Sequence, residues 1–286
     1  MKSDVNIQNS NSPQSKLRGR RIRNVVLMIL ALIAIGSVVV WQNQSLIHST
    51  FTTGYILLGS FILLTAFNMR KRIPSIAQLG SAAFWMQVHI YVGLATFVLF
   101  GLHVGWKIPN GQFELLLTML YLIVAVSGVY GLYVTRTIPR KLSAINDEVI
   151  YERIPSFRAK LAAEARGLVL EACQHSDVLA RFYRNRLAEY FERPRSLAYL
   201  ANPNGRLRRQ LMSEIDDLDR YLSNDQRSLS QQLSLMVKKK DDLDYHAAQQ
   251  GRLKIWLFAH IGFTYSLLLL SIFHGVMAHA FAGGLR

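Results

Sequence analysis

Five long apolar runs separated by charged segments constrain the fold of this chain more than any other feature. They cover residues 24–41, 51–69, 84–106, 113–134 and 255–282. Each run reaches or approaches the ~20 residues that an α-helix needs to cross ~30 Å of hydrocarbon. The chain holds 33 Lys and Arg residues although 51% of it is hydrophobic. The two kinds of residue are segregated, since the charges lie between the apolar runs. We therefore predict an all-α, polytopic membrane helical bundle of about five spans.

The basic residues predict how these spans are oriented. The net charge is +15, and Lys and Arg cluster in residues 16–23, 70–72, 136–141 and 252–254. All four clusters fall on one side if the chain crosses the bilayer after every span, and Lys and Arg mark the cytoplasmic side. We expect an integral protein of a bacterial-type cytoplasmic membrane, with the N-terminus and residues 135–250 cytoplasmic. Because the charge follows the membrane flanks, the lipid bilayer is the expected partner and nucleic acid is not.

Composition divides the chain into four segments. Residues 1–23 form a basic cytoplasmic tail without apolar periodicity, which predicts disorder. Residues 24–134 hold the first four transmembrane helices, and residues 251–286 hold the fifth. Residues 135–250 are polar, but Leu, Ala, Phe and Met recur at helical spacing, which predicts a helical cytoplasmic insertion that could receive a partner subunit. This insertion has no G-x-G-x-x-G and no P-loop, so we expect no NAD(P)H or flavin site in the chain.

Two of the apolar runs carry the same histidine pattern. The motif W-x3-H-I-x12-H occurs in residues 85–103 and again in residues 256–274, with histidine spacings of 103 − 89 = 14 and 274 − 260 = 14. Fourteen helical steps return to within roughly 40° of the same face, about 21 Å along the axis. Each helix therefore offers one histidine near each side of a bilayer. If the two helices were antiparallel, the first histidine of one would be level with the second histidine of the other. In parallel helices the level partners are His89 with His260 and His103 with His274.

Histidines inside apolar spans indicate a bound group. Ionisable side chains within a membrane are costly and usually functional. Two imidazoles that face each other from neighbouring helices can ligate a haem iron from both sides, which suits one-electron transfer. Two levels of histidines therefore predict two b-type haems. The haems would be non-covalent because no C-x-x-C-H motif occurs, and the single cysteine, Cys173, excludes a disulfide or an Fe–S cluster within the chain.

Glycines and tryptophans beside these histidines support the same prediction. Gly93 follows the first histidine of its helix by one turn, and Gly101 precedes the second by two residues, so both could let a porphyrin approach. Trp85 and Trp256 could pack over the inner haem. Tryptophan near a membrane interface is also typical of an aromatic belt, so both interpretations stay open.

Other polar residues have plain alternatives to a role at a haem. Arg72, Arg252 and Lys254 could pair with inner propionates, or serve only as topology determinants. His279 lies about 140° around the helix from His274, which makes it a poor axial ligand, although it could contact a propionate or a quinone. Three histidines are expected in an exterior link or on the surface of the polar domain: His48, His175 and His246.

The paired histidine motif resembles that of dihaem b-type cytochromes. Its placement on the third and fifth spans is especially similar to the transmembrane domain of the ferric reductase and NADPH oxidase family. By this resemblance, the residues that match the ligands of two stacked haems are His89, His103, His260 and His274. That family usually has six spans followed by flavin and nicotinamide domains, whereas this chain has five runs and ends at Arg286. The resemblance therefore implies a separate electron donor, either a redox partner protein or a quinol.

The sequence thus predicts a dihaem cytochrome that passes electrons across the membrane between a cytoplasmic or quinol donor and an acceptor on the other side. It names no catalytic residue. One alternative is a metal-binding or transport protein that uses the histidines for Cu or Zn, although the histidines fall at two levels without Cys, Asp or Glu in their spans. The other alternative is a membrane scaffold that recruits partners through its cytoplasmic helices.

Overall fold

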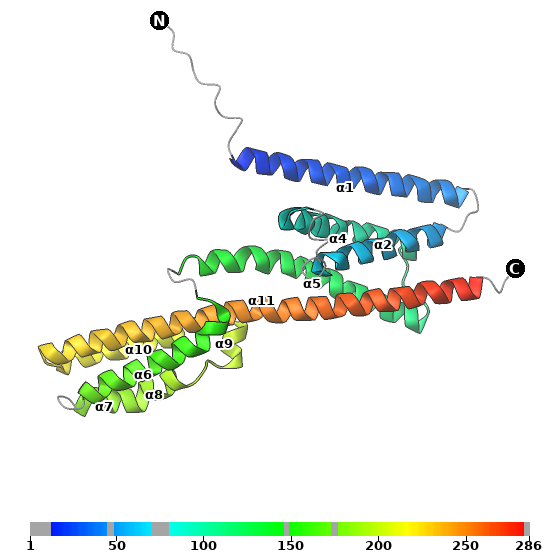
Figure 1. Cartoon of the computed structure of the whole chain (residues 1–286). Helices are drawn as coiled ribbons and strands as arrows, with labels where there is room; N and C mark the ends of the chain where they lie inside the picture. The colour runs from blue at the N-terminus through cyan, green and yellow to red at the C-terminus, as the bar shows by residue number, and fades with distance from the viewer. Residues whose placement is uncertain (1–12, 45–48, 70–79, 146–148, 173–176, 283–286) are drawn as a thin grey trace, which may run out of the picture. The chain divides into compact units, whose positions relative to one another are not determined.

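The computed structural model describes residues 13–44, 49–69, 80–145, 149–172 and 177–282 (Figure 1). Every regular element in these ranges is a helix, and none is a strand, which confirms the predicted all-α class. The chain forms two compact units. We call Met1–Val129 with His260–Arg286 the apolar unit, and Tyr130–Ala259 the polar unit.

Within the described residues, five helices are long and apolar enough to cross a membrane, as predicted. They are α1 (Pro13–Gln44), α2 (Ser49–Met69), α4 (Ala82–Val104), α5 (Gln112–Leu142) and α11 (Asn224–Ala282). Three of them extend beyond the predicted spans. Helix α1 begins within the segment predicted to be disordered, α5 continues through Pro139, and α11 runs without a break for 59 residues. The polar domain and the fifth span therefore share one helix, because no proline separates them and Gly251 alone does not end the helix.

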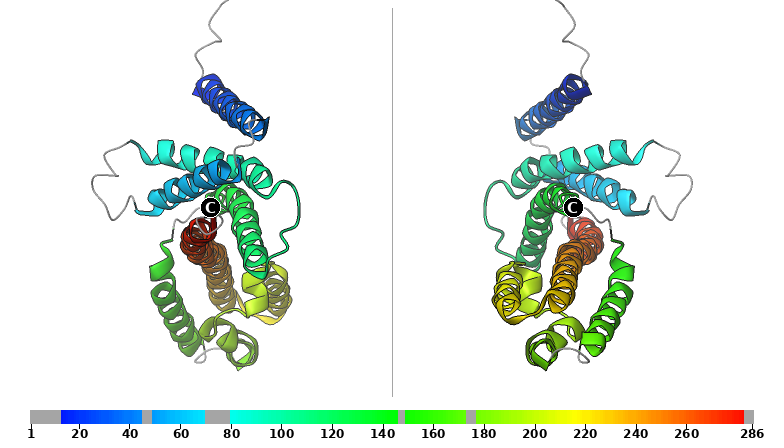
Figure 2. Two further views of the ribbon diagram at one scale, coloured as in Figure 1. Left: turned by 90° about the vertical axis from the view of Figure 1, so that its right-hand side faces the viewer. Right: turned by 90° about the vertical axis from the view of Figure 1, so that its left-hand side faces the viewer.

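Four helices of the apolar unit converge on one small core. Helix α2 packs closely along α4 (Figure 2). The buried members of the core are Leu57 and Phe61 of α2, Leu99 of α4, Tyr121 of α5 and Leu267 of α11. Leu99 and Leu267 each lie between the two histidines of their own helix, so an apolar layer separates the two histidine levels. Many outward side chains are apolar and exposed, which suits contact with lipid rather than water.

The ends of α4 are fixed by specific caps. At its start, the Ser81 hydroxyl accepts a hydrogen bond from the Phe84 N–H over 3.2 Å. At its end, Gly105 adopts a left-handed conformation with φ 64°, and the Trp106 N–H donates to the Gly101 carbonyl over 2.9 Å. The Trp106 ring lies against Gly101, where a Cβ would be 2.5 Å from it. The space beside Gly101 is thus filled by this indole, not left for a porphyrin.

The polar unit is a helical domain with its own core. Its elements before α11 are η1 (Tyr151–Arg153), α6 (Ile154–Ala172), α7 (Asp177–Phe182), a π-turn (Tyr183–Leu187), α8 (Ala188–Glu192), α9 (Leu197–Ala201), α10 (Arg206–Leu218) and η3 (Asp219–Tyr221). Fully buried side chains join them to the first half of α11, including Ala165, Leu187, Leu211, Leu233 and Val237. The helical insertion expected from the spacing of apolar residues is therefore present.

Candidate functional site

Two pairs of histidines face each other between α4 and α11. In the first pair, the rings of His89 and His260 have centroids 6.4 Å apart and planes at 72°. In the second pair, the rings of His103 and His274 have centroids 6.3 Å apart and planes at 88°. The predicted level partners are confirmed, and the cross-matched alternative is excluded. All four rings are half-buried.

The ring separation in both pairs suits a metal ion held between two imidazoles. Such an ion lies about 2 Å from each coordinating nitrogen, which places the two ring centres about 6 Å apart. Direct hydrogen bonding between two neutral imidazoles would require a closer approach of their nitrogens. The backbones of α4 and α11 are not among the closely packed helix pairs of the described residues, whereas α2 and α4 are. The two helices thus present paired side chains across a gap.

Two of the histidines already use Nδ1 in a hydrogen bond. His260 Nδ1 lies 2.6 Å from the Ser127 hydroxyl of α5. His103 Nδ1 lies 3.2 Å from the Thr50 carbonyl and 3.3 Å from the Thr53 hydroxyl, both on α2. Both histidines make these contacts through Nδ1. Histidines that ligate metals usually bond a protein acceptor through their second nitrogen in this way.

A cavity of about 450 Å³ adjoins the second pair, and both of its histidines line it. Cofactor pockets typically measure roughly 300–1,000 Å³ and are mostly apolar with a few polar groups. The lining here is of this kind, with aromatic and aliphatic side chains beside the charged Lys107 and Glu114. The second pair therefore stands in a space large enough for a small organic group.

Small residues keep side chains clear of the histidine rings. A Cβ on Gly54 of α2 would lie 3.1 Å from His103 Cε1, so an alanine there would press on the ring. A Cβ on Gly128 of α5 would lie 3.7 Å from His260 Cε1, which is ordinary contact. Nothing lies within 4 Å of a Cβ built on Gly93, so the space beside this glycine is open.

The predicted tryptophans differ in their surroundings. Trp85 is buried, one turn before His89, and its indole Nε1 has no hydrogen-bond partner among the described residues. The Trp256 ring packs on Gly131 of α5, where a Cβ would be 2.0 Å from Cζ2. Trp256 thus has a packing role that the sequence did not reveal. Arg72 falls outside the described residues.

Several residues of the site were missed by sequence reasoning. Ser127, Thr50, Thr53 and Gly54 contact the histidine rings from α2 and α5, two helices without a histidine motif. The available signal was weak. Hydroxyl side chains and glycines inside apolar runs are common packing residues in membranes.

The remaining histidines lie apart from the pairs. His279 contacts the Tyr55 hydroxyl and packs beside Phe51, with ring centroids 5.4 Å apart, so it is held by α2 rather than by another histidine. The prediction that His246 is a surface residue is wrong, because its side chain is 2% exposed in the polar unit. His48 and His175 lie outside the described residues. Among the described residues, no group of three or more His, Cys, Asp or Glu side chains could hold a metal ion.

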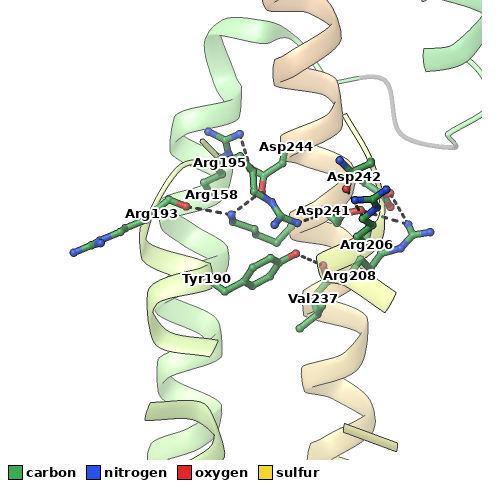
Figure 3. Close-up of polar contacts among 12 residues, drawn as sticks. Arg158, Tyr190, Arg193, Arg195, Arg206, Arg208, Val237, Asp241, Asp242 and Asp244 are labelled. Carbon is green, nitrogen blue, oxygen red and sulfur yellow. Dashed lines mark hydrogen bonds and ion pairs between the residues drawn. The ribbon is translucent and has the colours of Figure 1, made fainter. Parts of the chain in front are cut away.

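A second group of buried polar residues lies in the polar unit (Figure 3). Its centre is Asp244 of α11, which is fully buried. Asp244 oxygens lie 2.6 Å from Lys240 Nζ, 2.5 Å from an Arg158 nitrogen and 3.2 Å from Arg195 Nε. Arg195 also reaches Asp241, over 2.7 Å. The opposite charges around each of these side chains offset the free-energy cost of burying them.

Aromatic rings and main-chain oxygens complete this ionic cluster. Lys240 Nζ lies 4.5 Å from the centre of the Tyr190 ring and donates to the Arg193 carbonyl over 3.2 Å. The Tyr190 hydroxyl donates to the Val237 carbonyl over 3.0 Å, and burial raises the pKa of Tyr190. The cluster ties α6, α8 and the segment after α8 to α11. Its charged side chains pair with one another, which indicates a structural role.

No protein-family model, no curated protein and no solved structure matches this chain. Fold and site together define it as an all-helical protein with five helices capable of crossing a membrane and two stacked histidine pairs.

Proposed function

We propose that the chain is a dihaem b-type membrane cytochrome that passes electrons across the bilayer. One observation carries the proposal: two equivalent histidine pairs with ring centroids 6.4 and 6.3 Å apart, at both ends of one helix pair. Two neutral imidazoles gain little from facing each other, whereas an iron between them would be bound by both. Two histidines are also the number of protein ligands that a haem iron can take, since the porphyrin supplies its other four nitrogen ligands.

The residues present fit such a group. His89 with His260 and His103 with His274 would hold the two irons, and Nδ1 of His260 and of His103 would keep its bonds to α5 and α2. Lys107 beside the second pair could pair with a propionate. Trp85 Nε1, a buried donor, could bond a carboxylate near the first pair, and an unpaired buried donor is costly. When bound, a haem iron with two imidazole ligands supplies reversible one-electron transfer.

The proposed topology follows from the basic clusters. With the positive segments in the cytoplasm, the first pair is on the cytoplasmic side, the second pair is on the opposite side, and the polar unit is cytoplasmic. The polar unit would then be a surface for a partner subunit. The donor would be a redox partner protein or a quinol, and the likeness to the ferric reductase and NADPH oxidase transmembrane domain supports the transmembrane direction of transfer.

The test is a dithionite-reduced minus air-oxidised spectrum of the purified chain, with a pyridine haemochrome assay of stoichiometry. We expect a b-type spectrum and two haems per chain. Replacing His260 by Ala should leave one haem, as should His274→Ala, and the double variant should have none. The matched control is His279→Ala on the same helix, which should keep both haems because His279 contacts Tyr55 instead of a histidine.

Other outcomes would favour the alternatives. A colourless protein, made with haem supplied in excess, would overturn the proposal. Stoichiometric Cu or Zn in that protein, lost on replacing the same histidines, would establish a metal-binding or transport role. A protein without haem or metal that captures a partner through the polar unit would be a scaffold.

A further inference from the structure

The two histidine pairs differ in the partners of their Nδ1 atoms. In the first pair, His260 Nδ1 meets a side-chain hydroxyl, Ser127 Oγ, over 2.6 Å. In the second pair, His103 Nδ1 meets the Thr50 carbonyl over 3.2 Å and the Thr53 hydroxyl over 3.3 Å. The Ser127 contact is the shortest of the three.

The direction of the Ser127 bond follows from its second contact. The Ser127 hydroxyl also lies 2.8 Å from the Val124 carbonyl, which can only accept, so its proton points there. The Ser127 oxygen is then an acceptor for the N–H at His260 Nδ1. That assignment fixes the neutral tautomer of His260 in which Nε2 carries the lone pair.

An acceptor at the far nitrogen makes an imidazole a stronger ligand. Outer hydrogen bonds of this kind fix ring orientation and raise ligand basicity. A more basic axial ligand stabilises the ferric state over the ferrous state, which lowers the reduction potential.

We infer that Ser127 is a positioning residue that fixes the tautomer of His260 and lowers the reduction potential of the haem at the first pair. The inference rests on the proposed function.

The experiment is a redox titration of the full-length protein with Ser127→Ala and Ser127→Thr. Each variant is also made with His274→Ala, so that the haem at the first pair is titrated alone. We expect Ser127→Ala to raise the midpoint potential of this haem and to shift its low-spin ferric resonance signal. In the chain that keeps His274, the other haem should be unchanged. Ser127→Thr keeps the hydroxyl and should restore both readouts.

A matched control removes a hydroxyl that bonds its own helix. Ser266 of α11 donates to the Gly262 carbonyl over 3.1 Å, so Ser266→Ala should leave both potentials unchanged. An unchanged potential in Ser127→Ala, with two haems still bound, would overturn the inference and leave the proposed function intact. Equal shifts in the Ala and Thr variants would also overturn it. A wild-type chain without haem would overturn the proposed function itself.

Discussion

In the polar unit each buried charge faces an opposite charge, whereas in the apolar unit each histidine of a pair faces another histidine. Asp244 has three cations around it and needs nothing further. His89 and His260 are chemically alike, and at 6.4 Å between ring centroids they offer each other little. The contrast separates polar residues that satisfy one another from histidines that, on the proposed function, would receive another group.

The largest expected effect is loss of stability on neutralising Asp244. Asp244→Asn leaves Lys240, Arg195 and Arg158 without their shared counter-charge, and breaking a buried ion pair costs about 3–5 kcal/mol. Chemical unfolding of the full chain in detergent measures it. Glu164→Gln is the control, because Glu164 only makes a solvent-exposed pair with Lys160 at 3.9 Å. Equal effects of the two substitutions would contradict the structural role of the cluster.

Alanine substitutions at Gly131 and Gly93 should differ in their effect on stability, because the space beside the first glycine is filled and the space beside the second is open. In Gly131→Ala the new Cβ would lie 2.0 Å from the Trp256 ring, so we expect overpacking to cost about 1–3 kcal/mol. In Gly93→Ala the Cβ meets nothing within 4 Å, so the haem-free protein should be unaffected or slightly stabilised. Thermal unfolding of the haem-free chains measures both.

A larger side chain at Gly93 sharpens the same comparison. Gly93→Phe should lower haem content at the first pair while the haem-free protein unfolds as wild type does. A loss of stability equal to that of Gly131→Ala would show that the space beside Gly93 is filled in the folded protein.

Replacing a paired histidine should cost the haem-free fold little. His260→Leu removes one hydrogen bond to Ser127 and keeps a similar volume, so we expect less than about 1.5 kcal/mol in protein made without haem. With haem supplied, the wild type should gain stability that the variant lacks, because a ligand that binds only the folded state stabilises it. A haem-free cost as large as that of Asp244→Asn would mean that the histidine pairs are structural.

The smallest effect is expected at an exposed ion pair of the polar unit. The hydrogen bonds from Arg186 hold the pKa of Glu214 below its ordinary value of 4.5. A lowered pKa stabilises the folded state above the unfolded pKa, and the contribution is lost as the pH falls through the folded pKa. Glu214→Gln should therefore cost less than about 1 kcal/mol at neutral pH, and the difference should shrink below pH 4.5. A difference that grows in acid would contradict this assignment.

The fold could be predicted where a physical pattern repeats along the sequence. Runs of about 20 apolar residues identify five spans, because a bilayer imposes that length. The equal spacing of 14 predicts two level pairs, because both helices share one rise per residue. The parallel orientation expected from the basic clusters then selects His89 with His260 and His103 with His274. The extent of α11 was not predictable from apolar periodicity, since its first half is polar and is stabilised by Asp244 and its partners.

The residues around the histidines were harder to foresee. Ser127 and Gly54 act through contacts between helices that are distant in sequence, and neither belongs to a motif. The burial of His246 depends on how α11 packs within the polar unit, which its own sequence neighbours do not show. Contacts between distant segments of this kind cannot be predicted from the local sequence pattern.

The two Nδ1 contacts also differ in their robustness to genetic change. Ser127 can be lost by a single amino-acid replacement, and with it the acceptor at His260. The Thr50 carbonyl belongs to the main chain, so every residue at that position provides it. Natural variation could therefore adjust the first site freely while the second site keeps its hydrogen bond, which makes the first site the adjustable one of the two.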